Sequence, residues 1–313
     1  MALGENSVTT VTLFFPDWCA EAICAVASWG AGFQRRGMLA ELFRYFTLRC
    51  PPWARLLGLA YEHAAIATRH RRTAAAWTPH LDASRAAILA ATERCRDRRR
   101  ALVIGAGDCR DVPVTELAAR FDEVLLTDVV LGPEIRKLAK RSGGKVRTEI
   151  WDATGALAEL ARGVRSLSGG EVEAILARGE AGPPPGGEPD LVVSANCISQ
   201  LGMVPCDRLR AAEADDKLAD RCTAVAARRH QQWLAARTGV WVLLGDRARL
   251  DIAADGRELK REPMPGMDRL RKPDRSWQWL LAPIPEWSPN YNRVHEVGAW
   301  IDGPVGGRAR RQA

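Results

Sequence analysis

The hydrophobic pattern changes character near residue 100 and predicts two kinds of structure. In the first hundred residues Ala, Leu and Arg dominate, and apolar positions recur at helical spacing, as Leu81, Ile88 and Cys95 do at seven-residue steps. Three helices are expected first, over residues 17–29, 34–48 and 52–70. Thr78-Pro79 has the composition of a helix start, because proline fits the first helical position, so a fourth helix is expected from there.

From Ala101 onward, short apolar runs alternate with helical stretches. Strands are expected over residues 101–104, 123–127, 145–151, 191–195 and 239–245. Helices are expected over residues 114–120, 133–141, 156–162 and 211–236. Alternation of this kind predicts a parallel sheet with helices on both of its faces.

The last part of the chain is less regular. Residues 246–276 are charged and contain several prolines, which predicts a loop-rich insertion with a short helix. Two strand-like runs follow, over 277–281 and 293–301, and are expected to form an antiparallel hairpin at the sheet edge. The fold class predicted is therefore α/β, a Rossmann-like, mostly parallel seven-stranded sheet with an N-terminal helical domain.

The same pattern gives domain boundaries. Residues 1–97 are expected to form the helical domain, residues 98–303 the Rossmann-like domain, and residues 304–313, rich in glycine and arginine, a disordered tail. The start of the chain has no basic segment before an apolar one, so no signal peptide is expected. The apolar stretch 11–33 is too polar to span a membrane.

Composition and charge leave several partners open. The net charge of +7 comes from 45 basic and 38 acidic residues, a modest excess that favours anionic partners only weakly. The eight cysteines are scattered and form no C-x-x-C pair, which predicts reduced thiols in a cytoplasmic protein. The five histidines show no metal-ligand spacing, so no metal site is expected. The oligomeric state is left open.

The strand that ends at Ile104 leads into Gly105-Ala106-Gly107, where glycine permits a sharp turn and the close approach of a ligand to the backbone. The helix that follows would direct its free N–H groups at that ligand. A dinucleotide-binding turn needs a third glycine where this chain has Arg110, and no phosphate-loop lysine pattern occurs. A ligand without a pyrophosphate is therefore favoured.

Polar residues follow the next three strands. Asp128 stands about twenty residues past the glycine turn, where a carboxylate accepts hydrogen bonds from ribose hydroxyls in Rossmann sites. Asp152, with Ala153 beside it, is placed to meet the amine of an adenine. Asn196 ends the fourth strand, where ligand and substrate would meet. Each polar residue also has a simpler interpretation as a helix or turn cap, and the glycines as a plain turn.

Four segments carry a family resemblance: Val103-Ile-Gly-Ala-Gly-Asp108, Leu126-Thr-Asp128, Trp151-Asp-Ala153 and Asp190-Leu-Val-Val-Ser-Ala-Asn196. In this order they resemble class I S-adenosylmethionine-dependent methyltransferases, over roughly residues 98–302. The resemblance implies S-adenosylmethionine as cofactor, with its methionine part at the glycine turn, its ribose at the second-strand acid and its adenine after the third strand. It also implies a seventh strand antiparallel to the others.

The chain departs from the family in ways that leave the substrate open. The segment 98–101 offers no acidic residue before the first strand, and Asn196 is not followed by Pro-Pro-[Tyr/Phe], the mark of many amino-methylating nucleic-acid enzymes. A methyltransferase acting on a small molecule is predicted. Methyl transfer needs alignment and exclusion of water more than a dedicated base, so no catalytic residue is assigned.

Two other functions remain open at this point. The basic runs Arg69–Arg72 and Arg94–Arg100 would suit an RNA-modifying methyltransferase, although such runs are more often solvated helix faces. A non-catalytic Rossmann module that serves as a binding partner or scaffold is the second alternative. Among late residues, His295 is a candidate for the substrate pocket, whereas His70 and His80 are expected to be structural.

Overall fold

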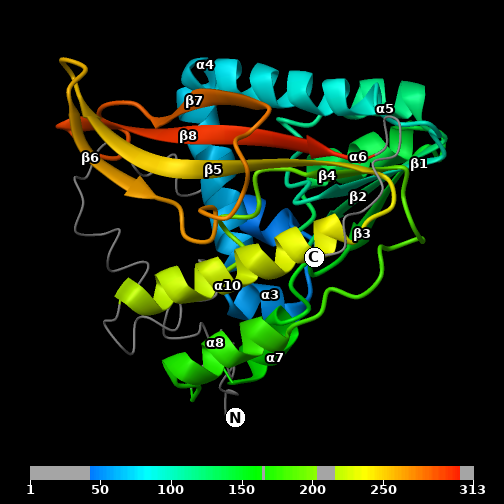
Figure 1. The fold of residues 1–313 in the computed structure, drawn as a ribbon, viewed down its shortest axis with the longest axis horizontal. Helices are drawn as coiled ribbons and strands as arrows, with labels where there is room; N and C mark the ends of the chain where they lie inside the picture. The colour runs from blue at the N-terminus through cyan, green and yellow to red at the C-terminus, as the bar shows by residue number, and fades with distance from the viewer. Residues whose placement is uncertain (1–42, 164–165, 203–215, 304–313) are drawn as a thin grey trace, which may run out of the picture.

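The computed structural model describes residues 43–163, 166–202 and 216–303 (Figure 1). Eight strands form one sheet: β1 (Arg100–Ile104), β2 (Glu123–Asp128), β3 (Val146–Ile150), β4 (Leu191–Ser194), β5 (Val240–Ala253), β6 (Glu258–Pro263), β7 (Arg275–Ala282) and β8 (Tyr291–Asp302). The helices are α3 (Pro52–Leu56), α4 (Leu59–Thr92), α5 (Val114–Arg120), α6 (Pro133–Arg141), α7 (Leu157–Gly163), α8 (Gly169–Arg178) and α10 (Asp216–Ala235).

The order of strands across the sheet is β3-β2-β1-β4-β5-β8-β7. The first five of these pair in parallel, whereas β8 lies antiparallel between β5 and β7. The predicted Rossmann-like α/β fold is confirmed, including the late antiparallel hairpin. Seven strands form this path, and β6 is an eighth that pairs with β5 alone.

Helices cover both faces of the sheet, as the alternating pattern predicts. Alternate residues of each strand point to opposite faces, and on β1 Ala101 and Val103 share a core with α4, α5 and α6. Leu102 and Ile104 point the other way, into a second core that includes Ala227 of α10. Beyond α10, the helices α3, α7 and α8 share a further apolar cluster with it (Figure 1).

The predicted helix start at Thr78-Pro79 lies too far along the chain. Two helical segments meet at a kink within α4 (Leu59–Thr92) at Thr73, whose φ of −117° and ψ of 20° are not helical, so the second segment begins before Thr78. Pro79 lies inside the helix, past that bend. The flanking side chains Trp77 and His80 are buried where α4 packs on β7, and this packing holds the helix through the proline.

The expectation of a loop-rich insertion over residues 246–276 holds only in part, because residues 264–274 contain no helix or strand but most of residues 246–263 are in strands. Strand β5 continues through Gly245 to Ala253 and turns at Gly256 into β6. The hairpin extends past the covering helices, so its side chains are charged; Arg261, for example, pairs with Glu258 and Glu296. Polar composition here reflects a solvated strand pair and not a loop.

Helix α8 was not predicted from the sequence. Ser168 and Glu171 form a capping box at its start, in which the Ser168 side chain accepts from the Glu171 N–H and the Glu171 carboxylate accepts from the Ser168 N–H. The spacing Ser-x-x-Glu is a helix-start signal that could have revealed it.

Part of the predicted N-terminal helical domain packs into the hydrophobic core of the sheet. Ala87, Ile88 and Ala91 of α4 are buried in the same cluster as the strands. The domain boundary at residues 97/98 stays a prediction, and the expected helix over 17–29, most of the one over 34–48 and the tail 304–313 lie outside the described residues. No described helix combines the length and apolar character needed to cross a membrane.

Candidate functional site

A cleft opens at the carboxyl ends of the parallel strands. Its empty volume is about 1310 Å³, including space open to solvent, and its walls come from α4, the loops after β1, β2, β3 and β4, and β7. Every residue that sequence analysis assigned to cofactor binding lines it: Gly105, Ala106, Gly107, Asp128, Asp152, Ala153 and Asn196. The structure therefore brings together residues that are up to ninety-one positions apart in the chain, as the Gly105–Asn196 pair shows.

The turn after β1 requires its glycines. Gly105 has a φ of +72°, and a Cβ at this position would stand 2.6 Å from the Cβ of Cys197. Gly107 has a φ of +51°, and its N–H donates to Asp128 Oδ2 at 2.8 Å. Both conformations are strained for residues with a side chain. The turn is thereby tied to the ends of both β2 and β4.

Asp128 is a partly buried carboxylate at the end of β2. Its Oδ2 accepts from the Gly107 N–H and its Oδ1 accepts from the Val130 N–H at 3.1 Å. Burial raises the pKa of Asp128, and nearby His63 and these backbone N–H groups oppose the rise. Asp128 thus holds the glycine turn in place while it forms part of the cleft wall.

Asp152 caps a helix in this structure. Its Oδ1 accepts from the N–H and the hydroxyl of Thr154 at 2.8 and 2.7 Å, and its Oδ2 accepts from the N–H of Leu157, the first residue of α7. The capping interpretation from the sequence therefore describes its hydrogen bonds, while Trp151, Asp152 and Ala153 still line the cleft. The Trp151 ring lies 5.4 Å from the ring of Trp233, measured between centroids.

Asn196 combines an unusual backbone with an unpaired oxygen. Its φ of +50° is left-handed, which is uncommon for a residue other than glycine. Its Nδ2 donates to Asp111 Oδ2 at 2.6 Å, whereas its Oδ1 is buried and has no hydrogen-bond partner in the described structure. A buried polar atom without a partner is costly and marks a place where a ligand can bind.

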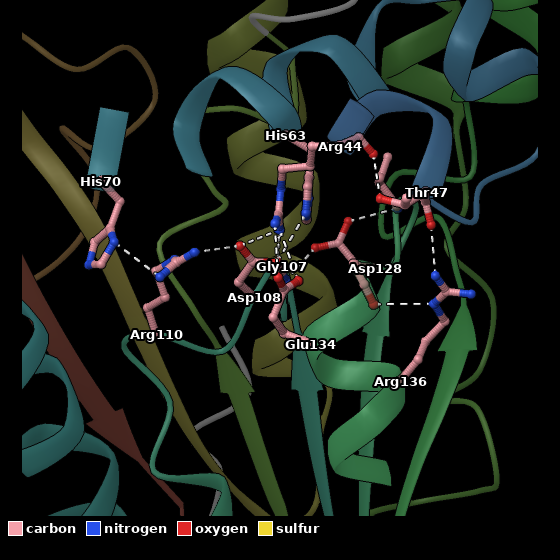
Figure 2. A network of polar contacts seen from close by, with 12 residues as sticks. Arg44, Thr47, His63, His70, Gly107, Asp108, Arg110, Asp128, Glu134 and Arg136 are labelled. Carbon is pink, nitrogen blue, oxygen red and sulfur yellow. Dashed lines mark hydrogen bonds and ion pairs between the residues drawn. The ribbon is translucent and has the colours of Figure 1, made fainter. Parts of the chain in front are cut away.

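Asp108, in the glycine turn, is the centre of a network that sequence analysis missed (Figure 2). Arg44 Nη2 donates to both of its oxygens, at 2.5 and 2.6 Å, and Arg110 Nη2 donates to Oδ2 at 3.0 Å. His63 Nε2 of α4 lies 3.3 Å from Oδ1. Burial alone would raise the pKa of Asp108, but His63, Arg44 and Arg110 lower it to about 2.

This network explains the residue in the third-glycine position. Arg110 turns away from the strand to bond Asp108 and to reach His70 Nδ1 at 3.0 Å (Figure 2). Arg44 also pairs with Glu134 of α6 at 3.0 Å. Arg44 and Asp108 are sixty-four residues apart, so no local pattern signals their contact. These ion pairs join the segment before α4, which carries Arg44, to the glycine turn.

Aromatic rings form the other end of the cleft. The rings of His80 and Trp279 are stacked with centroids 4.1 Å apart, and Trp77 meets Trp279 edge-on at 4.9 Å. All three residues line the cleft. Trp277 Nε1 donates to His80 Nδ1 at 3.0 Å. Burial lowers the pKa of His80 to about 4, although the nearby carboxylates Asp111 and Asp246 oppose this.

His295, the late-strand candidate, stands behind this aromatic wall. Its Nδ1 lies 3.1 Å from Asp246 Oδ2, which also accepts from the Ser199 hydroxyl at 3.0 Å. The ring of His295 meets Trp279 edge-on at 5.9 Å. His295 is not among the residues that line the cleft, whereas His80, expected to be structural, is one of them.

Comparison with known proteins gives matches only at the level of structure. No family model and no curated sequence matches the chain. Among solved structures, a 1,6-didemethyltoxoflavin-N1-methyltransferase from Burkholderia thailandensis is 17% identical with a TM-score of 0.33, covering 77% of this chain and 90% of that one. An O-methyltransferase family protein from the same organism is 14% identical with a TM-score of 0.32, covering 79% and 61%.

A third solved structure is the phosphoethanolamine N-methyltransferase 1 of Haemonchus contortus, which is 15% identical with a TM-score of 0.30 and covers 77% of this chain and 50% of that one. The similarity in each case is distant. The Rossmann-like fold is established by the strand order of this sheet itself, with β8 inserted antiparallel between β5 and β7.

Proposed function

We propose that this protein is an S-adenosylmethionine-dependent methyltransferase that acts on a small-molecule acceptor. One observation carries the proposal: the glycine turn, Asp128, Asp152, Ala153 and Asn196, selected from the sequence alone, all line one cleft at the carboxyl edge of the sheet. Ligands of open α/β sheets bind at this edge.

The cleft has features that fit the cofactor. The turn at Gly105 and Gly107 is closed against Cys197 and Asp128 on its inner side, and nothing lies within 4 Å of a Cβ placed on Gly107 except the Gly105 oxygen at 4.0 Å. Gly105 and Gly107 would hold the methionine part and Asp128 the ribose. Trp151, Asp152 and Ala153 would flank the adenine, with the Asp152 carboxylate already engaged as a cap.

The main contribution of this protein to methyl transfer would be to position the acceptor next to the cofactor. When bound, S-adenosylmethionine supplies an electrophilic methyl group on a sulfonium. The residues of the cleft align the acceptor with that methyl group and exclude water, and both effects favour the displacement. Trp77, Trp279 and Leu81 contribute apolar surface for this purpose.

Calorimetric titration with S-adenosylmethionine tests the proposal. The wild type is expected to bind, and Asp128→Asn to bind at least tenfold more weakly, because the substitution removes the charge that orients the glycine turn and the ribose. Asp122→Asn is the matched control, since Asp122 is exposed at the opposite end of β2. Wild-type protein that does not bind, or an Asp128→Asn variant that is folded in thermal melting and binds like the control, would contradict the proposal.

The alternatives receive less support from the structure. Guanidiniums of both basic runs are engaged within the fold: Arg72 bonds Glu286, Arg99 bonds Asp190 and Arg100 bonds Glu123. An RNA-modifying enzyme would bind RNA with a steep salt dependence, which distinguishes it. A non-catalytic module would bind the cofactor without transferring its methyl group. The five described cysteines are free thiols, which supports the proposed cytoplasmic location.

A further inference from the structure

The aromatic end of the cleft combines a flat apolar wall with polar atoms that have no hydrogen-bond partner in the described structure. The stacked rings of His80 and Trp279 and the edge-on ring of Trp77 form the wall. Asp111 and Asn196 line the same cleft. Two buried polar atoms here lack a partner in the described structure, the oxygen Oδ1 of Asn196 and the indole Nε1 of Trp279. Flat walls of this kind suit planar ligands, and the unpaired atoms provide sites for hydrogen bonds.

His80 can act as a hydrogen-bond donor but not as a base. The indole of Trp277 can only donate, so His80 Nδ1 must accept its hydrogen bond at 3.0 Å. The neutral ring therefore carries its proton on Nε2. Burial lowers the pKa of His80 to about 4, so the ring is neutral at neutral pH. With one nitrogen occupied and the other protonated, His80 has no lone pair with which to take a proton from an acceptor.

The other acids of the cleft are already engaged. Asp108 accepts from Arg44 and Arg110. Both oxygens of Asp128 and of Asp152 accept from backbone N–H groups. Glu62 also has a partner within the protein. The described structure gives Asp111 a single hydrogen bond, from Asn196 Nδ2 to Oδ2 at 2.6 Å, and leaves Oδ1 to the cleft.

Charge at this end selects against anions. The carboxylates of Asp111 and Asp246 both act on His80; Asp246 lies 3.1 Å from His295 Nδ1, whereas the described structure gives Asp111 no cationic partner. The nearest described guanidinium that lines the cleft, Arg110, is bonded to Asp108 and to His70. A carboxylate or phosphate on the acceptor would therefore meet like charge.

We propose that Asp111 binds and deprotonates the methyl acceptor, and that the acceptor is a planar aromatic compound, neutral or cationic, with an O–H or N–H on its ring. This inference rests on the proposed function. The acceptor's O or N forms a bond to the methyl carbon as the carbon–sulfur bond breaks, with that bond's electron pair passing to sulfur, which becomes a neutral thioether. The proton of the O–H or N–H passes to Asp111 Oδ1. General bases of this kind contribute about 10²–10⁴ in rate.

Three bicyclic probes of similar size test the binding half of the proposal. Calorimetry measures 6-hydroxyquinoline, quinoline and quinoline-6-carboxylate against protein saturated with S-adenosylhomocysteine. The wild type is expected to bind 6-hydroxyquinoline at least tenfold more tightly than quinoline, and the carboxylate most weakly. In Asp111→Ala, and in Asp111→Asn if the first variant does not fold, the preference for the hydroxyl should fall to within threefold. Asp82→Ala, at an exposed position of α4, is the control that should retain it.

The catalytic half is tested with S-adenosylmethionine and 6-hydroxyquinoline. Wild-type protein is expected to form 6-methoxyquinoline, and Asp111→Asn to do so at least a hundredfold more slowly in kcat, with KM raised only by the factor by which calorimetry shows binding of 6-hydroxyquinoline to weaken. Equal binding of the probes, a preference that survives in the Asp111 variants, or a bound hydroxyl that is not methylated would each overturn the inference. In those cases S-adenosylhomocysteine still binds, whereas failure of the proposed cofactor site appears as loss of that binding in the wild type.

Discussion

Asp108 shows how much of this site depends on single charged residues. Its side chain is only 7% exposed, yet it stays ionised because Arg44, Arg110 and His63 surround it. A buried charge is tolerated when it is paired and hydrogen-bonded in this way. The network fixes the glycine turn from the side opposite to Asp128 (Figure 2).

The shifted pKa of Asp108 predicts a pH dependence of stability. The folded-state pKa of about 2 lies below the unfolded value near 4, so the ionised form stabilises the fold. This contribution is complete above about pH 4 and is lost as the pH falls towards 2. Two pKa units correspond to about 2–3 kcal/mol. In urea denaturation, Asp108→Asn should be less stable than wild type at pH 7, and the difference should shrink by about two thirds of that amount at pH 2.5, which is still above the folded-state pKa.

Asp82→Asn is the control for that measurement, because the Asp82 side chain is 64% exposed and its ion pair with Arg85 lies on the surface. Its stability relative to wild type should not vary with pH over the same range. A constant difference between Asp108→Asn and wild type from pH 7 to pH 2.5 would show that the network does not hold Asp108 ionised.

At the scale of elements, the turn between β1 and α5 depends on close contact with the end of β4. Gly105→Ala would place a Cβ 2.6 Å from Cys197 Cβ and also force a left-handed backbone. The backbone cost alone is about 1–2 kcal/mol. Gly143 is the control position, because its φ of +63° is also left-handed but nothing lies within 4 Å of a Cβ placed there.

Alanine substitutions at Gly105 and Gly143 should therefore differ in stability and in cofactor binding. Gly105→Ala should lower the free energy of unfolding by clearly more than Gly143→Ala and should weaken S-adenosylmethionine binding at least tenfold in calorimetry. Gly143→Ala should lower the free energy of unfolding only by the backbone cost and should bind S-adenosylmethionine as the wild type does. If both variants bound the cofactor equally well, the turn would not be part of the cofactor site.

Elements with a strong local pattern were predicted well from the sequence. The parallel strands and the helix over 133–141 agree with the structure because buried strands and amphipathic helices each leave a periodic signature. The continuation of β5 to Ala253 and the passage of α4 through Pro79 were not predicted. Both depend on tertiary packing, on β8 in one case and on β7 in the other, which a local pattern does not contain.

At the scale of the whole molecule, the sequence predicted one side of the site better than the other. Gly105, Asp128, Asp152 and Asn196 each follow a strand, and the parallel sheet brings strand ends together, so position along the chain was enough. His63, His80 and Trp279 line the cleft from α4 and β7, and Arg44 contacts Asp108 from the segment before α4. Their contacts join residues far apart in the chain and have no local signal.

The most direct test of the account is a crystal structure of the protein with S-adenosylhomocysteine. We expect the ligand in the cleft, with its ribose hydroxyls at Asp128, its amino-acid part at the turn of Gly105 and Gly107, and its sulfur towards Asp111 and Asn196. An unoccupied cleft at saturating ligand, or a ligand bound elsewhere on the protein, would contradict the account.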